Sequence, residues 1–196
     1  MLSDYLKKHN ASEGLSNILL LLASLFPKVA ETLRTGSEGY VGGQNVFGEK
    51  QLKLDVYTND IFANALKANK YVSVIASEEL SGEEKGLDVE NGYAVAFDPL
   101  DGSSLVDVNL AVGSIFGFYR GNSFIGQKGK DQVAAMVVIY GPRLTMMLSV
   151  GQGVSEFCYD PQKKDFFLSR DNLRLDETKK MFAPGNLKAC DSEKWY

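Results

Sequence analysis

Apolar residues recur every three or four positions from residue 15 to residue 33, a spacing that predicts an amphipathic helix. The periodic positions are Leu15, Ile18, Leu19, Leu22, Phe26, Val29 and Leu33. Ser12 stands where an N-cap residue is expected, and Pro27 predicts either a kink or the start of a second helix. A glycine-rich loop at 35–48 and a further helix at 50–67 are predicted to follow.

Short runs rich in Val, Ile, Phe and Tyr dominate the rest of the chain and predict β-strands. They cover residues 71–76, 93–97, 114–119, 134–140, 144–150 and 154–159. Turn sequences at 141–142, 151–153 and 160–163 separate the last strands so closely that a largely antiparallel sheet is the economical arrangement. Helices followed by strands predict an α+β fold with helices packed on this sheet.

The composition excludes several functional classes. The 44% of hydrophobic residues can form a sizeable core, while the net charge of -4 argues against a nucleic-acid or anionic-membrane partner. The apolar run at 18–26 is too short to span a bilayer and is interpreted as a core helix. Cys158 and Cys190 lack CxxC spacing, which favours a reducing cytoplasm. His9 is the only histidine, so catalysis is expected to rely on carboxylates, hydroxyls, backbone amides and metal.

The strand predicted at 93–97 ends in the sequence Asp-Pro-Leu-Asp-Gly-Ser-Ser, residues 98–104. Asp98 and Asp101 are expected to emerge at a turn, where two carboxylates can converge on a hard cation such as Mg²⁺. The Gly-Ser-Ser that follows suits a turn or helix N-terminus whose N–H groups hold a phosphate oxygen. A plain turn is the alternative, because Asp, Pro and Gly are common turn residues. The acidic pair at 78–79 could likewise be a solvated strand end.

Together these segments resemble a known family, the class I fructose-1,6-bisphosphatases and the related sedoheptulose-1,7-bisphosphatases. The matching segments, in the same order and spacing, are residues 54–56, 77–79, 97–104 and 112–117. The resemblance extends from the N-terminal helix to residues 182–187. Residues 131–135 and 140–143 are most similar to the sedoheptulose branch, so both sugar substrates stay open.

The resemblance implies a role for each site residue. Glu78, Asp98, Asp101 and the carbonyl of Leu100 would bind two or more Mg²⁺ ions, with Mn²⁺ as a possible substitute. The attacking water would be polarised by Glu79 and Asp55, with Glu49 as the acidic residue of a mobile loop. The phosphate would be held by Gly102, Ser103 and Ser104. For Asp55 the alternative is an exposed helix position, with a buried stripe made by Leu54, Ile61 and Ala65.

The same resemblance implies a layered α/β sandwich shared with inositol monophosphatases. The reaction would be Mg²⁺-dependent hydrolysis of the 1-phosphate of a small-molecule sugar bisphosphate, by a homo-oligomer like the family's tetramer, with no nucleic-acid or membrane partner. Residues 1–196 would form the N-terminal metal- and phosphate-binding domain, with the C-terminal substrate domain absent. The alternatives are a truncated, non-catalytic metal-binding or assembly domain, and another lithium-sensitive sugar or inositol phosphatase.

Overall fold

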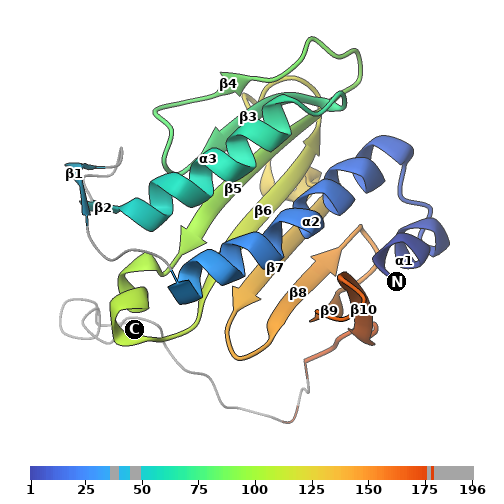
Figure 1. Cartoon of the computed structure of the whole chain (residues 1–196). Coiled ribbons are helices and arrows are strands. Elements are labelled where there is room, and N and C mark those ends of the chain that lie inside the picture. The colour runs from blue at the N-terminus through green and yellow to red at the C-terminus, as the bar shows by residue number, and fades with distance from the viewer. Residues whose placement is uncertain (36–39, 45–49, 176–177, 179–196) are drawn as a thin grey trace.

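The computed structural model describes residues 1–35, 40–44, 50–175 and 178 (Figure 1). The elements in chain order are α1 (Leu2–Lys8), α2 (Glu13–Thr35), β1 (Tyr40–Gln44), β2 (Lys50–Leu52), α3 (Lys53–Lys67), β3 (Val72–Ser77), β4 (Glu84–Lys85), β5 (Tyr93–Asp101), η1 (Ser103–Val108), β6 (Val112–Arg120), η2 (Gly129–Asp131), β7 (Ala134–Tyr140), β8 (Leu144–Ser149), β9 (Ser155–Asp160) and β10 (Asp165–Arg170). The α-helices come before the main sheet, which confirms the predicted α+β class.

The main sheet has eight strands in the order β10-β9-β8-β7-β6-β5-β3-β4, and β1 and β2 form a separate ribbon. The neighbouring strands of the main sheet are antiparallel except for β3 and β5, which are parallel. The prediction of a largely antiparallel sheet is therefore confirmed. The parallel pair has a specific consequence: β3 and β5 end at the same edge of the sheet, so the residues that follow β3 lie near the end of β5.

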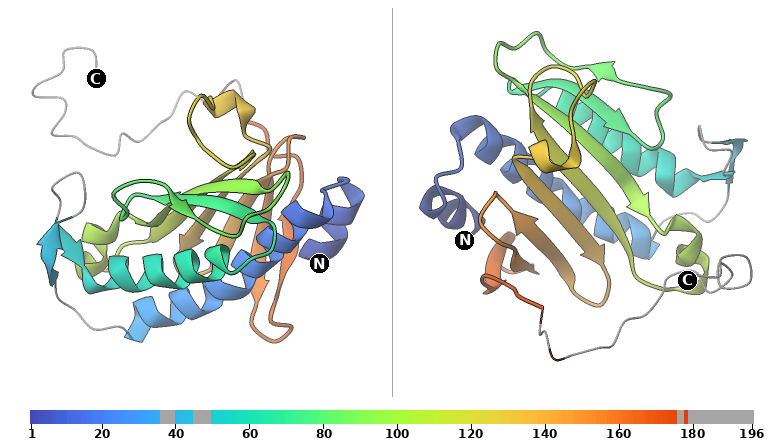
Figure 2. Two further views of the ribbon diagram at one scale, coloured as in Figure 1. Left: turned by 90° about the horizontal axis from the view of Figure 1, so that it is seen from above. Right: turned by 180° about the vertical axis from the view of Figure 1, so that it is seen from behind.

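Helices α2 and α3 lie side by side over one face of the sheet and form the second layer (Figures 1 and 2). Three phenylalanine rings join the layers. Phe26 of α2 and Phe62 of α3 have ring centroids 5.8 Å apart, and both rings contact Phe116 of β6 at 5.8 and 5.1 Å. All three side chains are at most 1% exposed, so their burial contributes strongly to the stability of this layered core.

Helix α2 begins where the sequence predicts, because the Ser12 hydroxyl accepts a hydrogen bond from the Leu15 N–H at 3.3 Å. The helix continues through Pro27 to Thr35. The expectation that Pro27 starts a second helix is therefore wrong, and the burial of Phe26 and Val29 on either side stabilises the turn that lacks one N–H.

By length and mean hydropathy α2 could also span a membrane. Its apolar side is instead buried against the sheet, as in the core helix of a globular fold. Its large buried side chains are Leu15, Ile18, Leu19, Leu22, Phe26 and Val29.

Strand β10, at one edge of the main sheet, and helix α1 were not predicted from the sequence. Helix α1 buries Leu2, Tyr5 and Leu6, and the Tyr5 hydroxyl lies 3.1 Å from Ser155 Oγ on β9. Helix α1 has only seven residues, which is too short for a helical period to stand out.

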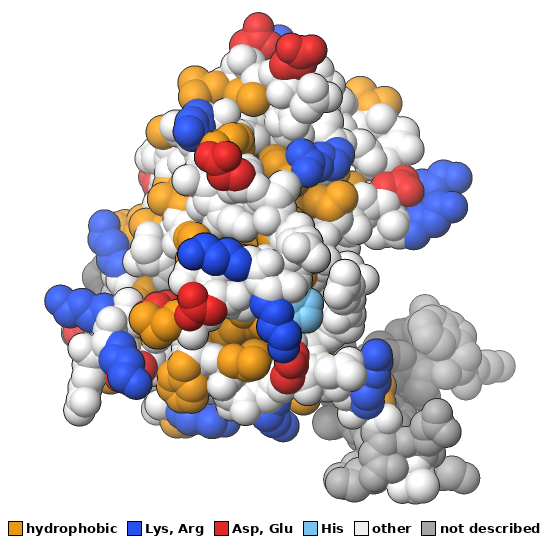
Figure 3. Space-filling model, turned by 90° about the vertical axis from the view of Figure 1, so that its right-hand side faces the viewer, with side chains coloured by type: hydrophobic (Ala, Val, Ile, Leu, Met, Phe, Trp, Pro, Cys, Tyr) orange, Lys and Arg blue, Asp and Glu red, His pale blue; other side chains and the backbone are white. Residues whose placement is uncertain are grey.

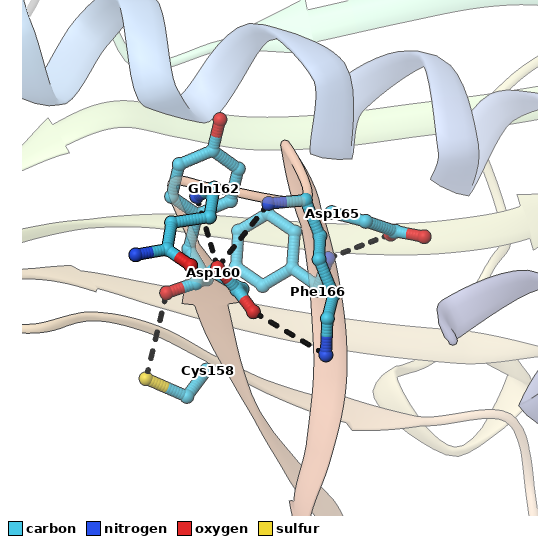
Figure 4. A network of polar contacts seen from close by, with 7 residues as sticks. Cys158, Asp160, Gln162, Asp165 and Phe166 are labelled. Carbon is cyan, nitrogen blue, oxygen red and sulfur yellow. Dashed lines mark hydrogen bonds and ion pairs between the residues drawn. The ribbon is translucent and has the colours of Figure 1, made fainter.

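The turn between β9 and β10 is held by Asp160 (Figure 4). Its Oδ1 accepts hydrogen bonds from the N–H groups of Lys163 and Gln162 at 3.2 and 2.9 Å. These contacts, that of Lys163 first, lower the pKa of the Asp160 carboxyl. On the face in Figure 3, the described lysines and arginines are interspersed with Asp and Glu, so no broad area of one charge is visible there.

Candidate active site

Strand β5 carries a β-bulge at the acidic segment. Asp98 pairs with Ile115 of β6, and Asp101 pairs with Gly113. Between these two pairs β5 therefore has one residue more than β6. Pro99 lies inside this bulge, where the missing N–H breaks no regular ladder bond. The sequence placed Asp98 and Asp101 at a turn beyond the strand. That placement is wrong, because the strand continues through the bulge to Asp101.

Hydrogen bonds on both sides hold the bulge. The Leu100 N–H donates to Asp98 Oδ1 at 3.0 Å, and the Ser114 hydroxyl donates to the Pro99 carbonyl at 2.6 Å. Ser114 Oγ also lies 2.9 Å from the Tyr140 hydroxyl. Ser114 is fully buried and Tyr140 nearly so, and burial raises the pKa of Tyr140. The phenol is therefore protonated at neutral pH and available as a donor.

Glu78 and Asp98 lie together where β3 ends and the bulge of β5 begins. The Glu78 N–H donates to the Phe97 carbonyl at 3.1 Å, so Glu78 extends beside β5 past the end of β3. Burial, then the negative charge of Glu78, raise the pKa of Asp98 to about 7; Asp101 adds to the rise, and the Leu100 N–H opposes it. A pair of carboxylates crowded in this way is stabilised by a proton or by a cation.

The Glu78 and Asp98 pair offers carboxylate oxygens, the donors that Mg²⁺ prefers. Within the described residues no group of three His, Cys, Asp or Glu side chains is arranged to hold one metal ion. Asp101, which the sequence expected in the same group, is exposed. A cavity of about 640 Å³ opens beside the pair, lined among others by Phe97, Ile115, Gly117 and Gln132. It provides room for a small substrate next to the two carboxylates.

The segment expected to bind phosphate begins a short 3₁₀ helix directly after β5. Gly102 has φ 78, a left-handed conformation that favours glycine, and its carbonyl accepts from the Leu105 N–H at 2.8 Å. Ser103 is half-buried and Ser104 is exposed. The predicted turn or helix N-terminus is confirmed, and first-turn N–H groups of such helices have no partner within the helix.

Asp55 is buried on α3, with 4% of its surface exposed. Thr58, Asn59 and Phe62 are buried on the same helix, whereas Ile61 is only half-buried. The alternative that treated Asp55 as an exposed position is therefore wrong. The polar side was judged to face solvent, but Asp55, Thr58 and Asn59 are all buried in the helix, which packs on β3 and β5.

Three further residues were expected at the site: Glu79, Leu100 and Glu49. Glu79 follows Glu78 and is half-buried, and its N–H donates to Ser77 Oγ at 3.3 Å. Leu100 is buried, with 3% of its surface exposed. Glu49 lies outside the described residues, as does the segment 182–187.

Ser114 and Tyr140 are the two residues beneath the bulge to which the sequence assigned no role. Both occupy inward-facing positions of strands whose other inward positions are apolar, as the alternating burial of β7 shows. A hydroxyl at such a position needs a hydrogen-bond partner, and that is the sequence signal that could have identified them.

Comparisons with known proteins agree with this fold and show the family to which the chain belongs. The family model for the fructose-1,6-bisphosphatase N-terminal domain matches residues 1–171. A class 1 fructose-1,6-bisphosphatase of Geobacter metallireducens is 42% identical over 185 residues, which cover 94% of this chain and 58% of that protein. One of Pelobacter propionicus is 40% identical over 188 residues, with 95% and 58% covered. The chain thus spans less than two thirds of these relatives.

Solved structures of the same kind superpose on most of the chain. Fructose-1,6-bisphosphatase of Leishmania major in its holo form gives a TM-score of 0.84 at 29% identity, covering 91% of this chain and 60% of that one. A Toxoplasma gondii protein named as a sedoheptulose-1,7 bisphosphatase gives 0.84 at 27% identity, covering 97% and 64%. The layered fold is therefore that of the sugar-phosphatase class. Within that class, the chain belongs to the fructose-1,6-bisphosphatase family.

Proposed function

We propose that the protein to which this chain belongs hydrolyses the 1-phosphate of fructose 1,6-bisphosphate, or the corresponding phosphate of sedoheptulose 1,7-bisphosphate, with Mg²⁺ as its cofactor. The observation that carries the proposal is the Glu78 and Asp98 pair beside two parallel strands, together with the Gly-Ser-Ser segment that directly follows β5 in the chain. Carboxylates that bind a cation and amides that bind an anion are the two requirements for hydrolysing a phosphate ester.

Glu78 and Asp98 are proposed as the main Mg²⁺ ligands, joined by Asp101 and the Leu100 carbonyl. Bound Mg²⁺ would supply charge neutralisation at the phosphate oxygens and at the leaving oxygen. The raised pKa of Asp98 supports the assignment, because two carboxylates crowded together are stabilised by a bound proton or by a cation. Mn²⁺, which also favours oxygen ligands, is expected to substitute.

The other residues are proposed to handle water and phosphate. Glu79 and Asp55 orient the attacking water and receive its proton, and Glu49 is proposed to assist them. The water oxygen attacks phosphorus and the bond from phosphorus to the sugar oxygen breaks. The sugar oxygen takes up a proton from solvent, and the sugar alcohol and inorganic phosphate leave. Backbone N–H groups and hydroxyls at residues 102–104 hold the phosphate oxygens throughout.

Phosphate release from each ketose bisphosphate tests the proposal, with Mg²⁺ and with excess EDTA. We expect turnover with Mg²⁺ and its loss with EDTA. Glu79→Gln should lower turnover by a factor of about 10² to 10⁴, the usual contribution of a general base. Glu90→Gln, at an exposed acid outside the site, is the matched control and should have no effect. Undiminished turnover in EDTA would refute the proposal, and the ratio of the two rates identifies the preferred sugar.

A second candidate is a non-catalytic metal-binding or assembly domain. The observation in its favour is that the chain spans 58% of its Geobacter metallireducens relative. In that case Mg²⁺ binds with no phosphate release. Residues 1–196 are proposed as the metal- and phosphate-binding domain, in a cytoplasmic homo-oligomer. Size-exclusion chromatography with light scattering measures the oligomer directly.

A further inference from the structure

The Pro99–Leu100 peptide group links Asp98 to the interior of the sheet. Its N–H, on Leu100, donates to Asp98 Oδ1 at 3.0 Å. Its carbonyl, on Pro99, accepts from the Ser114 hydroxyl at 2.6 Å. A peptide group is planar and nearly rigid, so fixing its carbonyl end also fixes the direction of its N–H.

The direction of each hydrogen bond follows from proton counting. A serine hydroxyl has one proton, and Ser114 gives it to the Pro99 carbonyl. The contact between Ser114 Oγ and the Tyr140 hydroxyl, at 2.9 Å, must therefore have Tyr140 as the donor. The series runs from Tyr140 to Ser114, from Ser114 to the Pro99 carbonyl, and from the Leu100 N–H to Asp98. Each donor in it is used once.

Because these groups are buried, this one arrangement of their hydrogen bonds is favoured over any other. Ser114 has no exposed surface and Tyr140 has 7%, so water does not compete readily for either hydroxyl. Breaking one bond would leave a buried polar group unpaired, which costs more than the bond itself contributes. The bulge supplies the extra residue that aims the Pro99 carbonyl at Ser114 instead of at a regular ladder partner.

We propose that Ser114 and Tyr140 are positioning residues, which hold the Pro99–Leu100 peptide and through it the Asp98 carboxylate in the orientation needed to bind a divalent cation. Neither hydroxyl touches the cation or the substrate. The effect on cation binding rests on the proposed function, whereas the effect on the peptide group does not. Asp98 is thus oriented by side chains of β6 and β7 as well as by its neighbours along β5.

The molecule contains a matched control for this series. The Tyr5 hydroxyl lies 3.1 Å from Ser155 Oγ, and Ser155 donates to Asp171 Oδ1 at 2.7 Å. Tyr5 and Ser155 are 5% and 2% exposed, so this is the same tyrosine-to-serine arrangement with similar burial. It lies at the α1 and β9 side of the fold, away from β5. Removing its hydroxyls should perturb stability alone.

The experiment compares Tyr140→Phe and Ser114→Ala with Tyr5→Phe and Ser155→Ala. Amide hydrogen exchange of the Leu100 N–H is followed by NMR in metal-free protein, and Mg²⁺ affinity is measured by calorimetry. In the first two variants we expect Leu100 exchange to accelerate at least about fivefold beyond the average for β5, and Mg²⁺ to bind about tenfold more weakly. Both control variants should leave the two quantities unchanged. Tyr140→Phe preserves the ring, so it remains informative if Ser114→Ala folds poorly.

Three outcomes are decisive. Unchanged Leu100 exchange, or the same acceleration in the control variants, would overturn the positioning role. Unchanged Mg²⁺ affinity in Tyr140→Phe and Ser114→Ala, when the unmutated protein binds Mg²⁺, would overturn the link to Asp98. If the unmutated protein does not bind Mg²⁺ but Leu100 exchange accelerates as expected in Tyr140→Phe and Ser114→Ala, the proposed function is refuted. The role of Ser114 and Tyr140 in positioning the Pro99–Leu100 peptide is then still supported.

Discussion

Asp98 of β5 lies next to Glu78, the residue that follows the parallel strand β3, although the two are twenty positions apart in the chain. Neither residue has a nearby histidine, cysteine or third acid arranged to share one metal ion within the described part of the chain. The pair is therefore the element of the site whose behaviour can be tested most directly. Its crowding raises the pKa of Asp98 to about 7, and three predictions follow from that value.

Asp98→Asn should abolish stabilisation by Mg²⁺. At a Mg²⁺ concentration about a hundred times the dissociation constant, linkage stabilises the unmutated protein by about 2.7 kcal/mol. For a protein of this size that is a rise in Tm of about 5 to 11 °C. The variant should show almost none of it, and its Tm in EDTA at pH 8 should equal or exceed that of the unmutated protein, because one repelling charge is gone.

Melting curves in EDTA and in excess Mg²⁺ check this prediction, with Asp88→Asn as the control because Asp88 is an exposed acid outside the site. If Asp98 only caps the bulge, Mg²⁺ would do little to either protein. The substitution would then cost about 1 kcal/mol through the weakened hydrogen bond from Leu100. Equal metal-induced shifts in the unmutated protein and in Asp98→Asn would remove Asp98 from the proposed site.

Mg²⁺ should bind more tightly as the pH rises from 6 to 8. A cation needs the ionised form of Asp98, and a proton competes for it below a pKa of about 7. The ionised fraction increases about tenfold over this range, so the affinity should increase by about the same factor. Calorimetry in buffers of different ionisation enthalpy should detect nearly one proton released per site at pH 6 and almost none at pH 8. An affinity independent of pH would contradict the assignment.

The metal-free protein should lose stability over the same pH range. The pKa of Asp98 is raised on folding from 3.8 to about 7, so the folded state binds the proton more tightly than the unfolded state. This contribution is complete below pH 4 and is lost as the pH rises through 7. In EDTA, the Tm of Asp98→Asn should therefore gain on that of the unmutated protein between pH 5 and pH 8. A constant difference across that range would show that folding does not raise the pKa of Asp98.

Much of the fold could be predicted because the pattern of apolar residues is locally decisive. The bounds expected for β7, residues 134–140, match the structure, and α2 begins at the expected cap. Helix α1 and the two-residue strand β4 could not be predicted, since neither is long enough to show a period. The parallel pairing of β3 with β5 also could not be predicted from the pattern of apolar residues. Strand pairing over long separations depends on tertiary packing, which no local window contains.

The candidate site was predictable only in part, for the same reason. The acidic residues at the ends of the strands were found from their position after apolar runs, and Gly102 was expected at a turn or helix start, where it is. The bulge at Pro99 was taken for a turn, because a proline after a strand is more often a terminator than an insertion. Asp55 was expected to be exposed without the family resemblance, since helix periodicity does not say which side meets the sheet. The roles of all the site residues, in metal binding, phosphate binding and activation of water, stay predictions.

Gly113→Ala should destabilise the protein next to the site without adding or removing any charge. Gly113 pairs with Asp101 across the bulge, and a Cβ there would lie 2.7 Å from the Val138 carbonyl oxygen. That oxygen belongs to the backbone of β7, which cannot rotate away, so the cost should be about 1 to 3 kcal/mol, as for other overpacked positions. The Tm should fall by about 2 to 12 °C, given the size of the protein. Gly82→Ala is the control, because nothing lies within 4 Å of its added Cβ and its Tm should stay the same. A Gly113→Ala variant that melts with the unmutated protein would mean that β6 and β7 approach less closely there than the structure has them.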